Sequence, residues 1–212
     1  MTTEARAVLT TFAQAAHTAH PDLTALDQIS GDGDFGDNLR DGLDRVTAAL
    51  AARPDEPPFA VAAAVFLDEV GGTSGPLLGL LFQELARAHA AHAGDGQNAW
   101  RAGIREGLAA IQRVGEAQPG DRTLVDALTP ARDALESGAT PRGVAEAALT
   151  GAHATAALRA RRGRASYVGE RAVGSPDPGA LGIALLFWCR AHVAGEAPGG
   201  LADHLPERRT VR

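Results

Sequence analysis

Apolar residues recur every three or four positions along most of the chain, and polar residues fill the positions between them. Residues at this spacing lie on one face of an α-helix, so the pattern predicts amphipathic helices rather than strands. Proline, glycine and short polar runs interrupt the pattern where helices are expected to end. About eight helices are predicted, covering roughly residues 3–20, 39–50, 61–70, 77–92, 100–111, 124–135, 141 onward and 178–193.

Particular residues are expected to begin or end these helices. Pro21 is expected to end the first helix, because proline lacks an N–H group and clashes with the preceding turn. Asp121 is a candidate N-cap for the sixth helix, and Thr140 followed by Pro141 is expected to begin the seventh. No change of composition and no internal repeat divides the chain. The prediction is a single all-α domain over residues 1–212, arranged as an up-and-down bundle.

Composition and charge narrow the class of protein. Hydrophobic residues make up 45% of the chain and aromatic residues only 4%, which favours close-packed helices over sheets. The net charge of −6 argues against a nucleic-acid partner, and the basic cluster at residues 159–164 is interpreted as a solvated helix end. The single cysteine, Cys189, is expected to be a buried, inert thiol. Because the sequence shows neither a signal peptide nor an apolar run of membrane-spanning length, a cytoplasmic protein without membrane association is predicted.

The most informative stretch, residues 27–38, places acidic residues among glycines between two predicted helices. Asp27, Asp32 and Asp34 are too close together for all three to stay ionised unless a cation neutralises them. Carboxylate oxygens on a tight glycine turn are what Mg²⁺ or Ca²⁺ requires, so a metal site is predicted, with an ordinary surface turn as the alternative. An EF-hand is excluded, because Gly36 and Leu43 stand where oxygen ligands belong.

Three further glycine-containing loops interrupt the helices, at residues 71–76, 115–123 and 164–179. In the first loop, glycines let a ligand approach the backbone, and N–H groups around Thr73 and Ser74 suit an anion. The alternatives are a helix C-cap followed by an N-cap for this loop, and surface salt bridges for Arg164 and Arg171. Alternate loops of an up-and-down bundle lie at the same end, where a metal, a phosphate loop and arginines can converge.

The chain therefore holds several motifs in a fixed order: Asp-x4-Asp-Gly-Asp at 27–34, Gly-Gly-x-Ser-Gly-Pro at 71–76, Gly-Asp-Arg-Thr and then Asp-Ala-Leu within 120–128, Arg-Ala-Ser-Tyr-x-Gly-Glu-Arg at 164–171, and Asp-Pro-Gly at 177–179. In this order, across nearly the whole chain, the motifs resemble those of the L subunit of dihydroxyacetone kinase. This family is the DhaL-type, or DAK2, nucleotide-binding domain. Any one of the motifs alone is weak, whereas the ordered set is specific.

The resemblance implies an eight-helix antiparallel barrel with the nucleotide bound at one end. It implies that Asp27, Asp32 and Asp34 hold a pair of Mg²⁺ ions that bridge the phosphates of ADP or ATP. It further implies that Arg164 or Arg171 closes over the nucleotide and acts in catalysis. The implied nucleotide-binding residues are Phe35, Gly36, Asp37, Asn38, Gly72, Thr73, Ser74, Gly115, Leu124, Asp177, Pro178 and Gly179.

The resemblance also implies that the phosphotransferase reaction needs a second subunit. In this family a separate K-type subunit holds dihydroxyacetone covalently through a histidine, and the L subunit delivers the phosphoryl group. Where a phosphotransferase-system phosphoprotein is the donor, ADP stays bound as a cofactor; otherwise ATP exchanges as a substrate. A homodimer is also expected.

Two positions depart from the family pattern. Phe35 stands where the family usually has histidine, which removes a donor near the phosphates, and Asp37 replaces a usual threonine and adds negative charge. Asp37 therefore becomes an extra metal ligand, turns outward, or weakens nucleotide binding. Two other functions stay open: a kinase for another small polyol or ketose, and a divergent nucleotide-binding regulatory or interaction protein without phosphoryl transfer.

Overall fold

The structure, a computed structural model, describes residues 2–206. Over these residues the chain forms α-helices and short 3₁₀ turns and has no strand, which confirms the all-α prediction. The helices are α1 (Thr2–Ser30), α2 (Phe35–Ala52), α3 (Pro58–Asp68), α4 (Ser74–Ala91), α5 (Gly96–Gly115), α6 (Val125–Glu136), α7 (Pro141–Ala154), α8 (Ala165–Val168) and α9 (Pro178–Val193). Three 3₁₀ turns follow the same order: η1 (Thr155–Ala157), η2 (Gly169–Ala172) and η3 (Leu201–His204). All of the α-helices except α8 correspond to the eight predicted helices.

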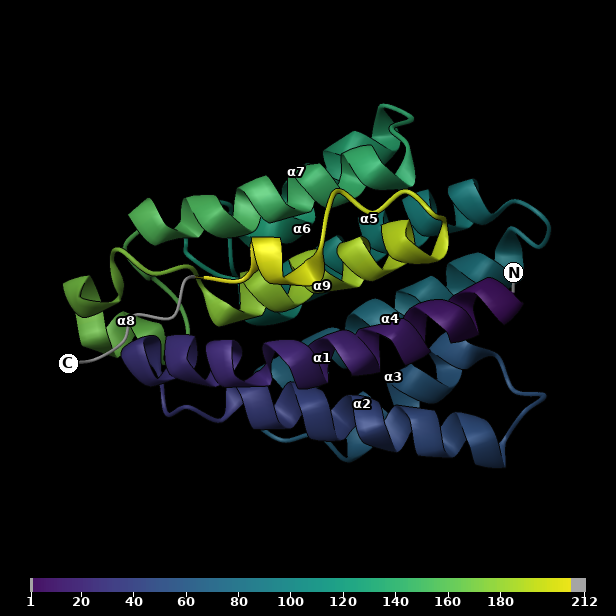
Figure 1. The fold of residues 1–212 in the computed structure, drawn as a ribbon, viewed down its shortest axis with the longest axis horizontal. Coiled ribbons are helices and arrows are strands. Elements are labelled where there is room, and N and C mark those ends of the chain that lie inside the picture. Colours follow the sequence, from purple (N-terminus) through teal and green to yellow (C-terminus); the bar gives the residue numbers. More distant parts are fainter. Residues whose placement is uncertain (1, 207–212) are drawn as a thin grey trace.

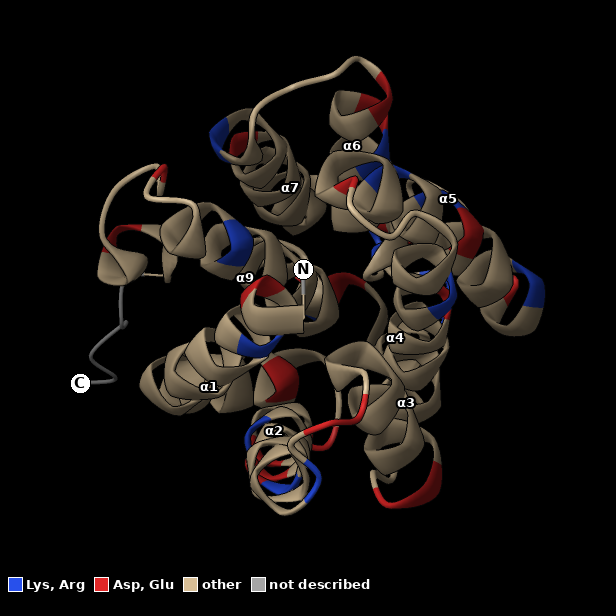
Figure 2. Ribbon diagram, turned by 90° about the vertical axis from the view of Figure 1, so that its right-hand side faces the viewer, with Lys and Arg blue, Asp and Glu red and all other residues tan. Residues whose placement is uncertain are grey.

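The eight longer helices form a closed antiparallel barrel (Figures 1 and 2). Each helix packs on the next in chain order from α1 to α7, α7 packs on α9, and α9 returns to α1. Consecutive helices run in opposite directions, so their connecting loops gather alternately at the two ends of the barrel (Figure 1). None of the helices in the described part of the chain is both long and apolar enough to cross a membrane.

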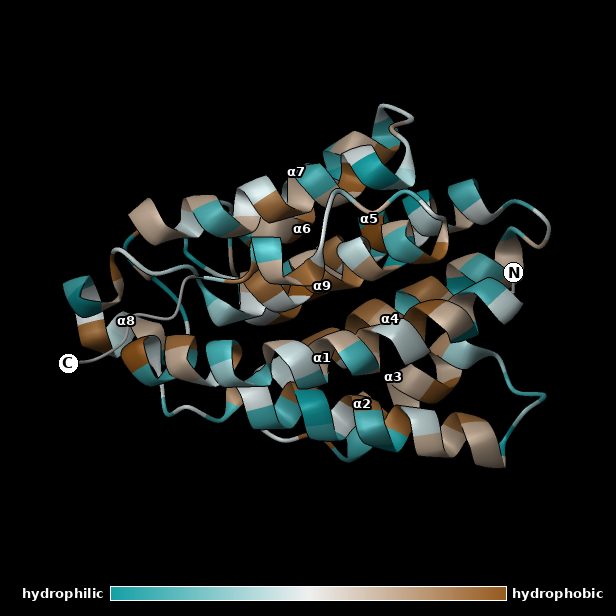
Figure 3. Cartoon of the chain, in the orientation of Figure 1, coloured by the Kyte–Doolittle hydropathy of each residue, from teal (hydrophilic) through white to brown (hydrophobic). Residues whose placement is uncertain are grey.

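The apolar faces of the helices meet inside the barrel and form its core (Figure 3). Helix α9 is apolar around most of its circumference and is buried along nearly its whole length, because α1, α6 and α7 pack around it. Cys189 lies on this helix and is fully buried. Burial raises the pKa of the Cys189 thiol, so it stays protonated and inert, as the sequence predicts.

The prediction that Pro21 ends the first helix is wrong. Helix α1 continues through Pro21 to Ser30, and the apolar stripe of its first half carries on through Leu23 and Leu26, which are both buried. Pro21 itself is exposed, so water can solvate the carbonyl group that loses its helical partner. The longer helix places Asp27 in its last turn rather than in a loop.

The prediction that Asp121 caps the sixth helix is also wrong. Helix α6 begins four residues later, at Val125, and the carboxylate of Asp121 instead accepts the N–H of Gln118 at 2.9 Å. Asp126 organises this turn by accepting the N–H groups of Gly120 and Thr123. The predicted start of α7 is confirmed, because Thr140 Oγ1 accepts the N–H of Gly143 and Pro141 is the first helical residue.

Candidate functional site

A pocket of about 380 Å³ is lined in part by residues 162–165, at the start of α8. Helix α8 lies at one end of the barrel (Figure 1). Five places in the sequence supply the walls of the pocket: the end of α1 with the start of α2, the loop before α4, the end of α5 with the start of α6, residues 162–165, and the start of α9. The antiparallel order of the helices brings these segments to the same end of the barrel.

Fourteen of the seventeen residues predicted for the site line this pocket. They are Asp27, Asp32, Asp34, Phe35, Asn38, Gly72, Thr73, Ser74, Gly115, Leu124, Arg164, Asp177, Pro178 and Gly179. Their individual roles toward a metal or nucleotide stay predictions.

Three predicted residues do not line the pocket: Gly36, Asp37 and Arg171. Gly36 instead lets α2 approach α1, because a Cβ atom there would lie 2.2 Å from Thr24 Oγ1. Arg171 lies on the exposed turn η2, beyond the lining segment 162–165.

Asp37 turns outward, which is one of the three outcomes that the sequence left open. Its Oδ1 lies 2.8 Å from His20 Nε2 on α1 and accepts a hydrogen bond of 2.7 Å from Arg40 Nη2 on α2. The hydrogen bond with His20, followed by the charge of Arg40, holds the pKa of the Asp37 carboxyl below its usual range. The extra negative charge is therefore compensated on the barrel surface instead of facing the pocket.

The acidic loop is held in shape by hydrogen bonds and by one ion pair. Asp27 Oδ2 accepts the backbone N–H of Phe35 at 3.0 Å, which ties the last turn of α1 to the first turn of α2. The Phe35 ring packs against Gly182 of α9, where an added Cβ atom would lie 2.9 Å from Phe35 Cζ. Asp32 pairs with the guanidinium of Arg164, which reaches across from the segment before α8.

The donor set of this loop fits a divalent cation. Within residues 2–206 no three acidic, histidine or cysteine side chains already converge at ligand distance. Three carboxylates nevertheless line one pocket, and a cationic side chain already pairs with Asp32 there. Like charges repel when nothing neutralises them, so convergence of the three carboxylates is expected only around a cation.

The rest of the lining combines the start of a helix, which suits an anion, with an apolar slot. Gly72 has a φ of 73°, which turns the chain into α4, and Thr73 and Ser74, which carry the first N–H groups of that helix, line the pocket. These N–H groups have no partner within the helix, and the helix dipole favours negative charge there. The lining also includes the apolar side chains of Leu77, Ile111, Leu124 and Val125, which form the apolar slot.

Asp177 is a buried carboxylate at the start of α9. Its Oδ2 accepts the N–H of Ala180 at 2.8 Å, and its own N–H donates to Thr155 Oγ1 at 2.7 Å. Burial raises the pKa of Asp177 to about 6, although the Ala180 N–H and the Arg122 guanidinium oppose the rise. Its ionised form therefore costs stability in the folded protein.

This raised pKa predicts a pH dependence of stability. Between pH 4 and 6 the folded state binds a proton at Asp177 that the unfolded state does not, so the stability supplied by Asp177 falls as pH rises. Asp177→Asn removes this slope and still offers an oxygen to the Ala180 N–H. Relative to wild type, the variant should gain about 2 kcal/mol of unfolding free energy between pH 4.5 and 6.5, measured by urea denaturation. If the difference in unfolding free energy between the variant and wild type is the same at pH 4.5 and at pH 6.5, the raised pKa of Asp177 is contradicted.

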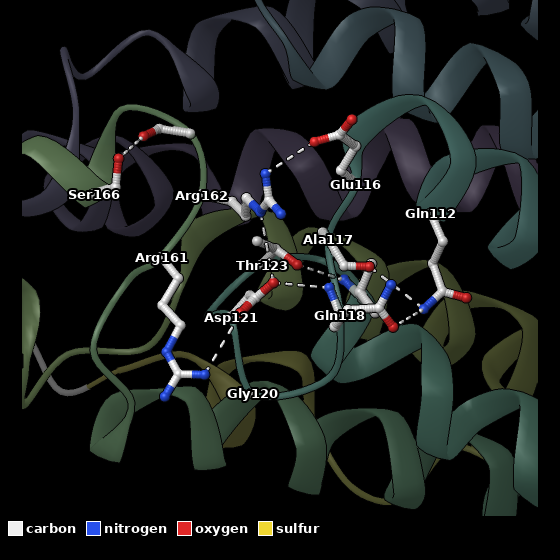
Figure 4. Close-up of polar contacts among 12 residues, drawn as sticks. Gln112, Glu116, Ala117, Gln118, Gly120, Asp121, Thr123, Arg161, Arg162 and Ser166 are labelled. Atoms are coloured by element: carbon white, nitrogen blue, oxygen red, sulfur yellow. Dashed lines mark hydrogen bonds and ion pairs between the residues drawn. The ribbon is translucent and has the colours of Figure 1, made fainter.

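The sequence interpretation missed several lining residues. Arg162 belongs to the basic cluster interpreted as a solvated helix end, yet it lines the pocket and pairs with Glu116 at 3.2 Å and with Asp121 at 3.8 Å (Figure 4). Arg122 also lines the pocket, and its side chain is fully buried. Arg122 belongs to the Gly-Asp-Arg-Thr motif, but the motif alone indicates no role for its side chain.

Comparison with known proteins defines the family. The DAK2 domain model matches residues 29–190, so the chain belongs to the DAK2 domain family. Two relatives are matched over most of their own length. The chain is 38% identical to the ADP-binding subunit DhaL of PEP-dependent dihydroxyacetone kinase 1 from Listeria innocua, over 78% of this chain and 83% of the relative. It is 32% identical to the corresponding DhaL subunit from Escherichia coli, over 82% and 88%.

Longer relatives contain this fold as a part. The chain is 37% identical to L-erythrulose 1-kinase from Mycolicibacterium smegmatis over 85% of this chain, but it spans only 34% of that kinase. The crystal structure of the dihydroxyacetone kinase from C. freundii in complex with AMP-PNP and Mg2+ superposes with a TM-score of 0.69 and 25% identity. That match covers 88% of this chain and 33% of the kinase.

Proposed function

We propose that this protein is the nucleotide-carrying subunit of a dihydroxyacetone-type kinase. The observation that carries the proposal is that three carboxylates, the loop before α4, an arginine and an apolar slot all line one pocket. The two relatives matched over most of their length, both named as ADP-binding DhaL subunits, support it.

The proposal assigns the metal to the acidic loop. Asp27, Asp32 and Asp34 would hold two Mg²⁺ ions, because three carboxylates and a nucleotide carry more charge than one divalent ion neutralises. Magnesium held by these carboxylates would neutralise the negative charge of the ADP or ATP phosphates. The C. freundii kinase, whose structure contains AMP-PNP and Mg2+, supports a magnesium nucleotide.

The remaining lining residues would orient the nucleotide. The N–H groups at Thr73 and Ser74, with the amide of Asn38, would hold phosphate oxygens. Gly115 and Leu124 would border the adenine ring in the apolar slot, and the turn Asp177–Gly179 would close over the nucleotide. Arg164 would face the transferred phosphoryl group and stabilise the charge that develops on it. Catalysis would rest on positioning and charge, since phosphoryl transfer needs no covalent contribution from these residues.

The acceptor would be a small ketose held by a separate K-type subunit. The relatives named as kinases of dihydroxyacetone and of erythrulose support this class of acceptor. With a phosphotransferase-system phosphoprotein as donor, ADP would stay bound and be phosphorylated in place; with ATP as donor it would exchange. A homodimer stays a prediction that light scattering would test. The reaction would take place in the cytoplasm.

An apolar rim around the pocket supports docking of a partner protein. Three of the five large hydrophobic side chains that are exposed in the described part of the chain lie within two residues of a pocket-lining residue: Ile29, Val114 and Tyr167. Tyr167 is 90% exposed and lies two residues from the lining residue Ala165. Exposed apolar residues gathered in one region are typical of protein interfaces.

This rim predicts a variant that loses the partner and keeps the nucleotide. Tyr167→Ala should weaken binding of the K-type subunit about tenfold, because exposed tyrosines are often strong interface contacts. The apparent KM for the partner should rise while the Kd for ADP stays unchanged. Leu67→Ala, at the exposed apolar residue on α3, is the matched control. Equal effects of the two substitutions on partner binding would contradict the docking assignment.

The proposed function is tested by calorimetric titration of ADP and ATP with and without Mg²⁺, after a check for copurified nucleotide. Transfer of phosphate to dihydroxyacetone and to erythrulose is then measured with a K-type subunit present. Mg²⁺-dependent binding followed by transfer supports the proposal, and retained ADP favours the phosphoprotein donor. Binding without transfer to any acceptor would favour the regulatory alternative, and no binding at all would overturn the nucleotide site.

A further inference from the structure

We infer that Arg122, together with Asp121, is a positioning residue: the pair clamps both ends of the segment 161–176 and so sets where Arg164 stands in the pocket. This segment connects η1 to α9 and contains α8 and η2. The effect on catalysis rests on the proposed function, whereas the clamp itself is a property of the folded chain.

The first end of the segment is held by Asp121. The backbone N–H of Arg161 donates to the carbonyl oxygen of Asp121 at 3.1 Å. The Asp121 carboxylate lies 3.9 Å from Arg161 Nη1 and 3.8 Å from Arg162 Nε, so both side chains point toward it (Figure 4). Asp121 is only 7% exposed, and its carboxylate is fixed by the N–H of Gln118.

The second end of the segment is held by Arg122 and by one backbone hydrogen bond, in which the N–H of Gly174 donates to the carbonyl oxygen of Ala156 at 2.8 Å. The Arg122 side chain makes three contacts there. Its Nη2 donates to the carbonyl oxygens of Ala172 at 3.0 Å and of Ser175 at 2.9 Å. Its Nη1 also lies 3.9 Å from Asp177 Oδ1, at the first residue after the segment. Asp121 and Arg122 are adjacent in one turn, and they hold the backbone of Arg161 and of Ser175, which lie fourteen residues apart in the chain. The same turn continues into Thr123 and Leu124, which line the pocket.

Arg122 stands in an energetically costly state. Its φ is 62°, a left-handed conformation that residues other than glycine rarely adopt, and its side chain is fully buried. Its Nε and Nη1 have no hydrogen-bond partner although both atoms are buried. Backbone strain and a partly unsatisfied buried charge both destabilise the folded protein. Such features are expected to persist only where the geometry of a site depends on them.

The clamp matters because the middle of the segment has few other anchors. α8 and η2 are single turns, and Ser166 bonds only to Gly163 within the segment. The pairs of Arg162 with Glu116 and of Arg164 with Asp32 join exposed side chains, and exposed pairs are individually weak. The contact of η2 with α1 adds one further support. Without the clamp, the position of Arg164 relative to the acidic loop would rest on these weak pairs and on the contact of η2 with α1.

The clamp is tested first by limited trypsin digestion without nucleotide. The segment and its flank supply cleavage sites at Arg159, Arg161, Arg162, Arg164 and Arg171. Arg122→Met should raise the cleavage rate at these sites at least about tenfold, because local opening exposes them. Arg122→Lys, which keeps the charge and hydrogen-bond donors, should restore most of the protection. Arg132→Met, at an arginine of α6 that pairs only with Asp133, should leave digestion unchanged.

The second test asks whether Arg122 acts through Arg164. Arg122→Met should lower kcat about 100-fold, since small misplacements of a catalytic group have effects of this size, with a smaller change in KM. On an Arg164→Ala background the same substitution should have little further effect, because the two residues act as a unit. Asp121→Asn, at the other end of the clamp, serves where Arg122→Met does not fold.

The outcomes separate the clamp from the proposed function. Unchanged digestion in both Arg122→Met and Asp121→Asn would overturn the clamp even if wild type binds nucleotide and transfers phosphate. Additive effects of Arg122→Met and Arg164→Ala on kcat would overturn the link to Arg164. If wild type neither binds nucleotide nor transfers phosphate, the proposed function fails, and the digestion pattern still decides the clamp.

Discussion

Asp32→Ala is expected to abolish Mg²⁺-dependent nucleotide binding while leaving the helical barrel intact. Asp32 lies in the glycine turn between α1 and α2, outside the core, and its carboxylate lines the pocket. Removing a metal ligand should weaken binding of the magnesium nucleotide by more than about 100-fold, because loss of even an outer-shell partner costs 10- to 100-fold. Calorimetric titration of ADP with and without Mg²⁺ measures the loss.

A nearby carboxylate provides the control for this prediction. Asp41 is also an exposed acidic residue close to the start of α2, but it pairs with Arg40 on the surface and does not line the pocket. Asp41→Ala should therefore leave ADP affinity unchanged, and circular dichroism should show full helicity in both variants. Mg²⁺-dependent binding that survives in folded Asp32→Ala would remove the acidic loop as the metal site.

The spacing of apolar residues predicted the bounds of a helix where local residues such as proline or glycine mark its ends. The expected range 178–193 for the last helix coincides with α9, because the apolar run starts at a proline in the first helical position and stops before a glycine. Pro21 misled the same reasoning, since the burial of Leu23 and Leu26 outweighs the loss of one exposed hydrogen bond. Local signals cannot show how much tertiary packing a continued helix gains.

The sequence predicted those parts of the pocket that are formed by turns of distinctive composition. It predicted less well the parts that depend on the direction of a side chain. Gly72 and Asp32 stand in turns whose composition already suggests a ligand. Asp37 was undecidable from the sequence, because its direction depends on His20, seventeen residues away, and on Arg40. Arg122 looked like any charged turn residue, and only the fold reveals that it is buried beneath the segment that carries Arg164. Contacts between residues distant in the chain leave no local pattern.

Arg164→Ala is expected to change catalysis and metal affinity in opposite directions. Arg164 pairs with Asp32, so its guanidinium competes with a cation for that carboxylate in the chain without nucleotide. Its loss should raise the Mg²⁺ affinity of the nucleotide-free protein about two- to fivefold, which matches the weak strength of an exposed ion pair. A guanidinium released from Asp32 would be free to face the phosphoryl group. Its loss should then lower kcat about 1000-fold, as for other arginines that stabilise phosphoryl transfer.

Arg171→Ala is the matched control for this pair of effects, because Arg171 belongs to the same segment but does not line the pocket. It should leave both the Mg²⁺ affinity and kcat unchanged. Mg²⁺ titration of the nucleotide-free protein and single-turnover transfer in the presence of the K-type subunit measure the two quantities separately. A fall in both would mean that Arg164 supports the fold of the acidic loop. Unchanged kcat together with tighter Mg²⁺ would mean that Arg164 only competes with the metal, and that another cation faces the phosphoryl group.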